Sequence, residues 1–376
     1  MAALALPFPV VVLVFSPTTE HLAIASDDGS IRIYQKPYTK VWKALRNLGP
    51  EISSVAFALD SSSTSFPLWV ACGQHILCFE LACDSLILER KDCIFESRVT
   101  EEAEDILNQI TINKSYLAYT LDSGIVGTLD LKTKEQKTMK TSHSNLCTNV
   151  SFIPNRPREM VSTGYDFNIL HHDFPLGTIL SSFQVGEIVS IYIMLHLIHP
   201  TESPAEPASQ ISLSPPFIQC LTMSSNGVIA CGLADGRIWI GFGGERSLAH
   251  RKKRRKWDGL RKDNASYVQV ADGPVVDVFV FTLSLSKPSR DIDKVLRAFV
   301  NSDILVTLSL LGTLTAFQIL EGKLDKKLSS HTVKGILKAN SLATNGTDVW
   351  VGGISSKNQG IAVSLSLETL QKETEQ

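Results

Sequence analysis

The chain has 376 residues, of which 44% are hydrophobic, and it carries 36 basic and 38 acidic side chains. This length supplies enough apolar side chains for a large core. The near balance of charge excludes a globally charged surface as the basis for recognising nucleic acid or membranes, so charge-based recognition must be local. The seven cysteines are odd in number and include no CxxC pair. This usage favours reduced thiols and a location in the cytoplasm, the nucleus or both.

A pattern of strand, tight turn and strand recurs along the chain. It is clearest in HLAIASDDGSIRIYQ (His21–Gln35) and returns in EMVSTGYDFNILHHD (Glu159–Asp173) and VIACGLADGRIWIGF (Val228–Phe242). The Asp-Gly pairs at 28–29 and 235–236 suit a two-residue hairpin turn. Repeats of about 40–45 residues are typical of β-propellers, in which no unit buries its own core. The sequence therefore predicts an all-β ring of seven four-stranded blades.

The predicted blades form a single domain of residues 1–370. In chain order they cover residues 10–36, 51–90, 104–138, 143–184, 217–248, 274–325 and 332–370. Ala2–Leu6 precede the first unit, and we expect them to pair as the outermost strand of the last blade, beside Ile361–Leu367. An open ring would otherwise leave a long unpaired strand edge.

Four further segments are interpreted from their composition. The acidic stretch 97–106 indicates a helix or a loop, and Ile188–Ile198 is too short to span a membrane and indicates a buried strand. Residues 200–216, rich in Pro and Ser, and the densely basic residues 245–264 are predicted to be disordered insertions. Residues 371–376 are a polar tail.

Three polar residues of the fourth unit are candidates for a hydrogen-bond network. His143 precedes the first strand, Ser162 lies in the second, and Asp166 opens the following turn. This spacing resembles the WD-repeat family, in which a loop His reaches the turn Asp and a strand Ser supports it. His172 stands where that family has Trp. No unit keeps both the Gly-His and Trp-Asp pairs, so the repeats resemble degenerate WD40 repeats. The same residue types form catalytic triads, but their positions within one repeat favour a structural role.

A longer stretch is similar to one branch of the WD-repeat family. HSNLCTNVSFIPNRPREMVSTGYDFNIL at 143–170 follows DSGIVGTLDLKTKE at 122–135, and the HRKKRRK run at 250–256 lies late in the chain. Members of the branch carry similar runs and a similar basic insertion. The resemblance implies a seven-bladed adaptor, and its members are regarded as candidate substrate receptors for cullin-4 ubiquitin ligases.

The basic run has three interpretations. It is a nuclear import signal, a contact for nucleic acid or an acidic protein, or a solvated loop. Trp257 follows the run directly, and an exposed Trp is costly in a loop with no function, so it favours a docking role. The residues concerned are Arg251, Lys252, Lys253, Arg254, Arg255, Lys256 and Trp257.

No catalytic, metal-binding or cofactor-binding residue is predicted, and we expect the protein not to be an enzyme. The neighbours His171 and His172 point to opposite faces of one strand, and no nucleophile with a base or pair of carboxylates is evident. The main hypothesis is a non-catalytic scaffold, monomeric within a larger complex, whose faces bind other proteins, for example as a cullin-4-type substrate receptor. The alternative is an RNA- or ribosome-associated factor that uses residues 250–256. No membrane partner is expected.

Overall fold

A computed structural model describes the chain in seven stretches. They are residues 2–49, 51–58, 66–185, 214–243, 257–282, 303–320 and 323–367. The strand predicted at Ile188–Ile198, residues 200–213 and 245–256 of the two insertions, and the tail 371–376 lie outside the described residues. Within the described stretches, no helix has the length and apolar character needed to cross a membrane.

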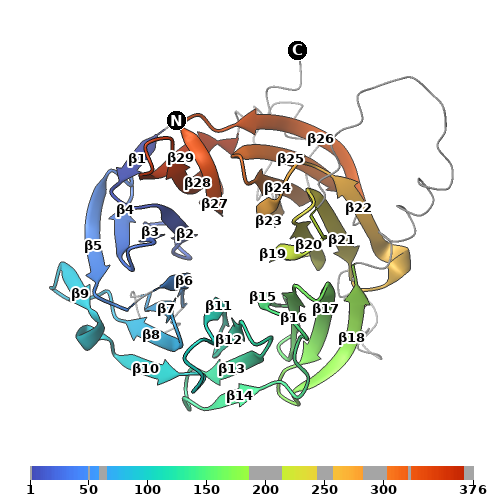
Figure 1. Ribbon diagram of the computed structural model, residues 1–376, viewed down its shortest axis with the longest axis horizontal. Coiled ribbons are helices and arrows are strands. Elements are labelled where there is room, and N and C mark those ends of the chain that lie inside the picture. The colour runs from blue at the N-terminus through green and yellow to red at the C-terminus, as the bar shows by residue number, and fades with distance from the viewer. Residues whose placement is uncertain are drawn as a thin grey trace, which may run out of the picture.

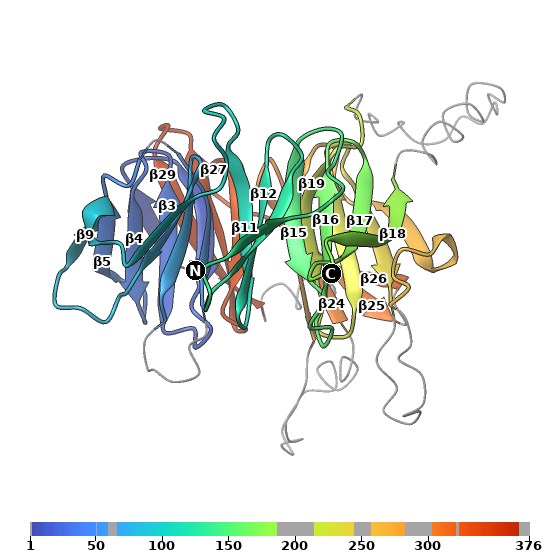
Figure 2. The ribbon, with the colours of Figure 1, turned by 90° about the horizontal axis from the view of Figure 1, so that it is seen from below.

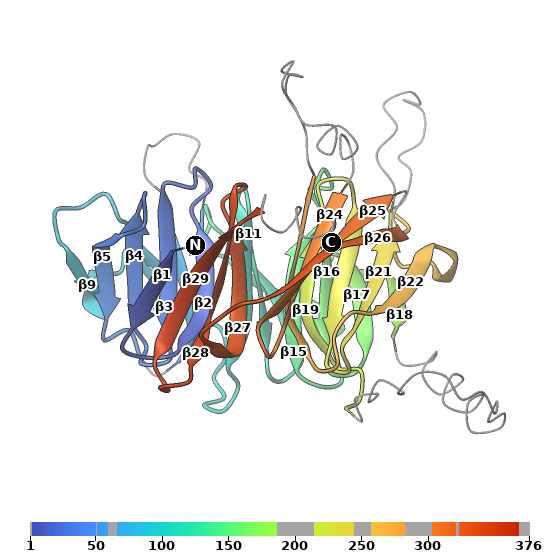
Figure 3. The same ribbon diagram turned by 90° about the horizontal axis from the view of Figure 1, so that it is seen from above.

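Seven antiparallel sheets form the blades of a closed ring (Figure 1). The all-β, seven-bladed prediction is confirmed. Figures 2 and 3 show that the strands run through the thickness of the ring, so the connections gather at two opposite faces. We call one of them the His143 face. It carries the connections between blades, including the one with His143, and the turns between the second and third strands of each blade.

Each blade contains four antiparallel strands, ordered from the central channel outward, and blade 1 carries a fifth at its outer edge. Blades 1 to 4 are β2 (Val10–Phe15), β3 (His21–Ser26), β4 (Ile31–Gln35) and β5 (Lys40–Arg46); β6 (Ile52–Phe57), β7 (Leu68–Cys72), β8 (His75–Phe79) and β10 (Phe95–Arg98); β11 (Leu107–Asn113), β12 (Tyr116–Leu121), β13 (Val126–Asp130) and β14 (Gln136–Thr138); β15 (Cys147–Phe152), β16 (Glu159–Gly164), β17 (Asn168–Asp173) and β18 (Thr178–Gln184). Blades 5 to 7 are β19 (Ile218–Met223), β20 (Val228–Leu233), β21 (Arg237–Phe242) and β22 (Ala265–Gln269); β23 (Val275–Thr282), β24 (Asp303–Ser309), β25 (Thr313–Leu320) and β26 (Lys323–Thr332); β27 (Ile336–Thr344), β28 (Asp348–Ser355), β29 (Gly360–Ser366) and β1 (Ala3–Leu6).

The N-terminal strand closes the ring, as predicted. β1 pairs antiparallel with β29, with Ala3 opposite Val363 and Leu6 opposite Gly360. Just before this ladder, the amide of Ser364 donates to the carbonyl of Ala2 at 2.8 Å. The last blade therefore takes its outermost strand from the start of the chain, which joins the two ends of the sequence in one sheet.

The inner strand of every blade contains a β-bulge near its start. Each bulge leaves one residue unpaired, and the residue before it is buried in all seven blades. The unpaired residues are Val11, Ser53, Asn108, Thr148, Gln219, Val276 and Asn340. A bulge bends the strand and redirects its side chains, so the bulges place short polar groups beside the neighbouring blade.

Side chains at the unpaired position, or at the residue directly after it, bond one blade to the next. Five donate to a backbone carbonyl of the following inner strand: Ser54 to Ile110 at 3.4 Å, Asn108 to Cys147 at 3.0 Å, Thr148 to Ile218 at 3.0 Å, Cys220 to Val275 at 3.5 Å and Asn340 to Val10 at 2.7 Å. Three accept from a backbone amide: Gln109 from Val150 at 2.7 Å, Asp277 from Leu342 at 2.7 Å and Ser341 from Leu13 at 3.0 Å. Apolar side chains fill the remaining space between blades, as where Ile31 and Ile33 of blade 1 meet Val70 and Phe79 of blade 2.

The seam between blades 1 and 2 is held at the outer rim instead. Its bulge residue, Val11, has no side-chain donor or acceptor. A short strand between β8 and β10, β9 (Ile87–Glu89), pairs in parallel with the outer edge of β5. Buried Lys43 donates its ammonium group to the carbonyls of Cys83 and Ser85 at 2.6 Å each. Blade 1 is consequently five-stranded, and its edge is covered.

Four predicted boundaries and one alternative require correction. The first two units end too early, because the outer strand of blade 1 runs to Arg46 and that of blade 2 to Arg98. The fourth strand of blade 5, β22, follows the basic insertion, so the unit ends at Gln269 rather than at 248, and the last strand of blade 6 runs to Thr332. The insertion predicted at 245–264 is also too long, because residues 257–264 are part of the described fold. The acidic stretch 97–106 ends β10 and continues as a loop, so the helical alternative is wrong.

Ring closure predicts unequal effects for proline at neighbouring positions of β1. Bonded pairs alternate along an antiparallel ladder, so the amide of Leu4 faces β29 while that of Ala5 points away from it. We expect Leu4→Pro to lower the free energy of unfolding by about 2–3 kcal/mol and Ala5→Pro by less than about 1 kcal/mol. Equal losses in chemical denaturation would show that β1 does not hold the ring closed.

Candidate functional site

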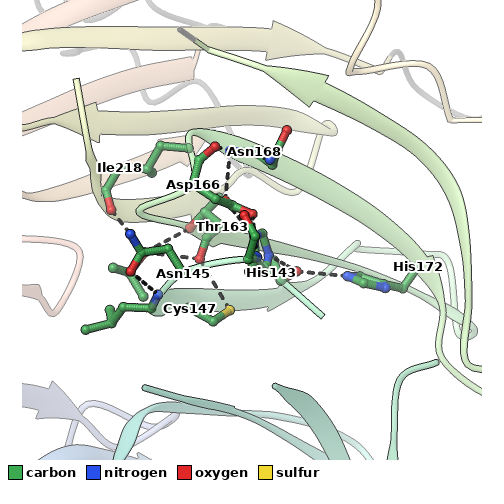
Figure 4. Close-up of polar contacts among 12 residues, drawn as sticks. His143, Asn145, Cys147, Thr163, Asp166, Asn168, His172 and Ile218 are labelled. Carbon is green, nitrogen blue, oxygen red and sulfur yellow. Dashed lines mark hydrogen bonds and ion pairs between the residues drawn. The ribbon is translucent and has the colours of Figure 1, made fainter. Parts of the chain in front are cut away.

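The structure brings the three predicted network residues together in blade 4 (Figure 4). His143 Nδ1 lies 2.9 Å from Asp166 Oδ1, and His143 Nε2 lies 2.8 Å from Ser162 Oγ. The same hydroxyl lies 2.8 Å from Nε2 of His172. Four side chains thus form one chain of hydrogen bonds from the turn to the third strand.

The local sequence positions both ends of this chain. Asp166 accepts the amides of Ser144 and Asn168 at 3.1 Å each, so its carboxylate holds the connection and the turn together. Gly164 ends β16 directly beside the imidazole, and a Cβ there would lie 2.8 Å from His143 Nδ1. A larger residue would therefore displace the histidine.

The contacts also assign the protons. With its proton on Nδ1, His143 donates to Asp166, and its bare Nε2 accepts the hydroxyl proton of Ser162. Ser162 must in turn accept from Nε2–H of His172. Nδ1 of His172 is buried without a partner, and as an unprotonated acceptor it costs less than an orphaned donor. A tryptophan indole, which can only donate, would serve Ser162 in the same way, which explains how histidine replaces it here.

The surroundings of Asp166 and His172 shift the pKa of both groups downward. Burial alone would raise the pKa of Asp166, but the hydrogen bonds from His143 and Asn168 outweigh it and lower that pKa to about 2. Burial lowers the pKa of His172 to about 3, and the imidazoles of His143 and His171 act in the same direction. Asp166 is therefore ionised and His172 neutral at physiological pH.

This arrangement supports a structural role for the network. Ser162 and the side chain of His143 are fully buried, and the Asp166 carboxylate is 6% exposed. A nucleophile must reach its substrate, and this hydroxyl is enclosed between two imidazoles inside a sheet. Within the described residues, no group of three or more His, Cys, Asp or Glu side chains is arranged to hold a metal ion. The seven cysteines are free thiols.

His171 belongs to a second, separate polar group on the opposite face of β17. Its Nδ1 lies 3.0 Å from Ser181 Oγ, and its Nε2 lies 3.0 Å from Glu159 Oε2. Burial would raise the pKa of Glu159, but the hydrogen bond to His171 and the charge of Arg156 lower it overall. The imidazole also meets the ring of Trp257 edge-on at 5.0 Å. The sequence did not single out these contacts.

Trp257 corrects the prediction of an exposed docking side chain. It is 1% exposed, and its indole N–H donates to the carbonyl of Gly227 at 3.3 Å. The ring packs in the apolar cluster between blades 4 and 5, together with Ile229 and Trp239. Its burial by apolar neighbours outweighs the preference of its charged sequence neighbours for water.

Glycines make the space for this indole. A Cβ at Gly243 would overlap Nε1 of Trp257, and one at Gly259 would overlap the six-membered part of the ring. Gly243 and Trp257 therefore touch, although the chain between them includes the basic run. The six basic residues Arg251, Lys252, Lys253, Arg254, Arg255 and Lys256 themselves lie outside the described residues.

Three aromatic rings connect the turn of blade 4 to the start of blade 5. Phe217 stacks between Tyr165, with ring centroids 4.8 Å apart, and Phe167, with centroids 5.3 Å apart. Phe167 has φ +63°, a conformation that is costly for a bulky residue. The stack compensates for this strain and anchors the chain where it enters β19. It was not visible in the sequence because Phe217 is far from the turn.

Comparison with known proteins places this geometry in context. No family model matches the chain. It is similar to a WD repeat-containing protein 53 homolog from Dictyostelium discoideum, with 27% identity over 229 residues. The aligned region covers 59% of this chain and 58% of that relative, so just over half of each is matched. Among solved structures it is similar to the β-propeller domain of Cps50 (Swd1) from Myceliophteria thermophila, with 10% identity, a TM-score of 0.63 and coverage of 97% and 98% of the two chains.

The fold is a seven-bladed β-propeller, and the network of blade 4 resembles that of WD repeats. The structural likeness at 10% identity supports the fold alone. The curated relative is a WD repeat-containing protein, which confirms the resemblance to that family.

The buried network predicts acid sensitivity. The unfolded chain protonates His172 below its usual pKa of about 6.5, whereas the folded chain does so only near 3. The unfolded state therefore binds more protons between these values, and stability falls as the pH falls. Asp166 adds a further loss between about pH 4 and 2.

His172→Gln keeps a donor to Ser162 and removes this titration. We expect it to flatten the pH dependence of unfolding free energy between pH 6.5 and 4 by up to about 1 kcal/mol per pH unit. His75→Gln, at a side chain that is 26% exposed, is the control and should change the slope less. An unchanged slope for His172→Gln would place that imidazole in contact with solvent.

The close contact of Gly243 with the indole of Trp257 predicts that alanine substitution lowers stability at Gly243 but not at Gly273. Gly243→Ala should lower the free energy of unfolding by more than about 2 kcal/mol, because the methyl group overlaps Trp257. Gly273 has nothing within 4 Å of its Cβ position, so Gly273→Ala should be nearly neutral. Thermal and chemical unfolding measure both, and similar stabilities for the two variants would mean that Trp257 is not held in the slot.

Proposed function

We propose that the protein is a non-catalytic scaffold that binds other proteins on the faces of its propeller. The observation that carries this is the burial of the polar constellation of blade 4. His143, Ser162 and Asp166 are enclosed and hold the blade together, while the connections at both faces present exposed side chains. Loops positioned by a rigid framework are the usual place for recognition, and the similarity to a WD repeat-containing protein supports the same role.

A more specific form of the proposal is a substrate receptor of a cullin-4-type ubiquitin ligase. The support is the sequence similarity of the stretch 143–170 to the branch of WD-repeat proteins regarded as such receptors. Affinity purification of the tagged full chain, followed by mass spectrometry, tests it. We expect proteins to be recovered in near-stoichiometric amounts after nuclease treatment, with cullin-4 components among them. Recovery of partners without any cullin-4 component would reject the ligase role and leave the scaffold.

The alternative function is RNA or ribosome association through the basic run at 250–256. Six consecutive basic side chains could neutralise phosphates, and such binding weakens steeply as salt rises. In the same purification, recovery that is lost on nuclease treatment would favour this alternative. A shallow salt dependence with nuclease-resistant partners would contradict it.

We also propose that the basic run directs the protein to the nucleus. Neutralising Arg251 to Lys256 with glutamine leaves Trp257 in its slot, so the core should stay intact. A fluorescent fusion of this variant should shift toward the cytoplasm with an unchanged melting temperature. The control neutralises Lys36, Lys114 and Lys132, which are exposed lysines of blades 1 and 3. A nuclear-to-cytoplasmic ratio equal to the wild type would reject the import role.

A further inference from the structure

Blades 6 and 7 expose large apolar side chains on the His143 face. Leu311, in the turn between β24 and β25, is 70% exposed, and Leu337, at the start of β27, is 59% exposed. Phe8, in the connection from β1 to β2, is 45% exposed. Side chains of this size are rarely left in water beside one another unless they serve an interaction.

The segments that carry these side chains are in contact. The carbonyl of Leu310 accepts the amide of Ala339 at 2.8 Å, which fixes the turn of Leu311 beside the start of β27. Ile336 then pairs with Ser355, where the turn of blade 7 begins. That turn ends at Gly360, which packs directly against the carbonyl of Phe8. The three apolar residues therefore belong to one continuous region of the face.

This region is also basic. Lys334, Lys338 and Lys357 are exposed on the same segments. The segments 7–9, 310–312, 333–338 and 355–360 contain no Asp or Glu. We call this surface the leucine–lysine patch, defined by Phe8, Leu311, Leu337, Lys334, Lys338 and Lys357.

Connections and turns of the early blades on the His143 face carry acidic side chains. The connection from blade 2 to blade 3 contains Glu101, Glu102 and Glu104, and the turn of blade 1 contains Asp27 and Asp28. The face is therefore acidic over the early blades and basic over the last two. A partner that approaches it experiences an oriented field, which favours one docking direction.

We propose that the leucine–lysine patch docks an acidic segment of a partner protein that also carries apolar side chains. This rests on the proposed scaffold function and names the surface and the partner chemistry. Carboxylates complement the three lysines, and apolar side chains cover the leucines. RNA fits less well, because leucines do not bind phosphate and the acidic connections and turns of the early blades repel a long polyanion. A second copy of the chain fits less well too, because two identical basic patches would face each other.

A photo-crosslinking experiment on the full chain tests the proposal. p-Benzoyl-phenylalanine replaces Leu337 in one variant and Leu176 in the control, an equally exposed side chain (54%) on the other face. After irradiation in cells, mass spectrometry identifies the captured segments. We expect position 337, and not 176, to capture partner segments rich in Asp and Glu that also contain apolar residues.

Binding of the captured segment is then measured with a fluorescent synthetic peptide. The patch variant is Lys334→Glu/Lys338→Glu/Lys357→Glu, and the control variant is Lys36→Glu/Lys114→Glu/Lys132→Glu. We expect the patch variant to lose affinity by roughly tenfold or more and the control to stay within about twofold of the wild type. Leu311→Ser/Leu337→Ser should weaken binding as well, and equal melting temperatures show that the variants are folded.

Several results would overturn the proposal. Captured segments without an acidic excess, or equal affinity of the patch variant and the wild type, contradict it directly. Capture of RNA, of a second copy or of the chain's own residues 186–213 at position 337 would assign the patch to another occupant. Partner capture at position 176 alone would leave the scaffold function standing and remove the patch from it, whereas no protein capture at either position would reject both.

Discussion

The structure depends on the contacts that join one inner strand to the next. A blade presents apolar side chains on both faces, so it cannot be stable alone, and a ring holds only if every seam is closed. The bulges meet this constraint because they turn a side chain out of the ladder and toward the neighbouring blade. Asn108, Thr148 and Asn340 each donate to a carbonyl of the next inner strand. The pairing of β1 with β29 then closes the remaining gap in blade 7.

The same constraint explains where the protein departs from its own repeat. Blade 1 has valine at its bulge, and the seam that follows is held outside by β9 and by buried Lys43. The basic run interrupts blade 5 before its outer strand. The contact between Trp257 and Gly243 nevertheless holds the two ends of the interruption close together. Because the seams hold the ring, the connections are free to differ in composition. The leucine–lysine patch and the acidic connection before β11 are two such differences on one face.

Some of this could be predicted from sequence and some could not. The spacing of His143, Ser162 and Asp166 predicted a network because all three lie within one repeat, where local order preserves their geometry. The closing strand was predictable because Ala2–Leu6 are apolar and the ring needs an edge partner. The bulges were not, since the unpaired residue need not be of one type: valine, serine, asparagine, threonine and glutamine all occur there.

Trp257 shows the limit of reading a segment by its charge. It directly follows six basic residues, so composition placed it in solvent. What decides its position is a slot formed by glycines at 243 and 259 and by the carbonyl of Gly227, which are distant in sequence. The outer strand β22 was missed for a related reason: the other three strands of its blade are predicted from alternation, but the insertion separates β22 from them. Contacts between residues distant in sequence determine the positions of Trp257 and β22, and a local sequence pattern contains no information about such contacts.

Native-state hydrogen exchange tests most directly the claim that the seams hold the ring as one unit. The amides of Leu13, Val150 and Leu342 donate to side chains of the preceding blade, and they report on three seams. If the ring is a single cooperative unit, peptides containing these amides exchange only through global unfolding, with one common opening free energy that falls with denaturant as the global value does. A much lower opening free energy at one of the three, while the others stay protected, would show that the blades open independently and would contradict the account.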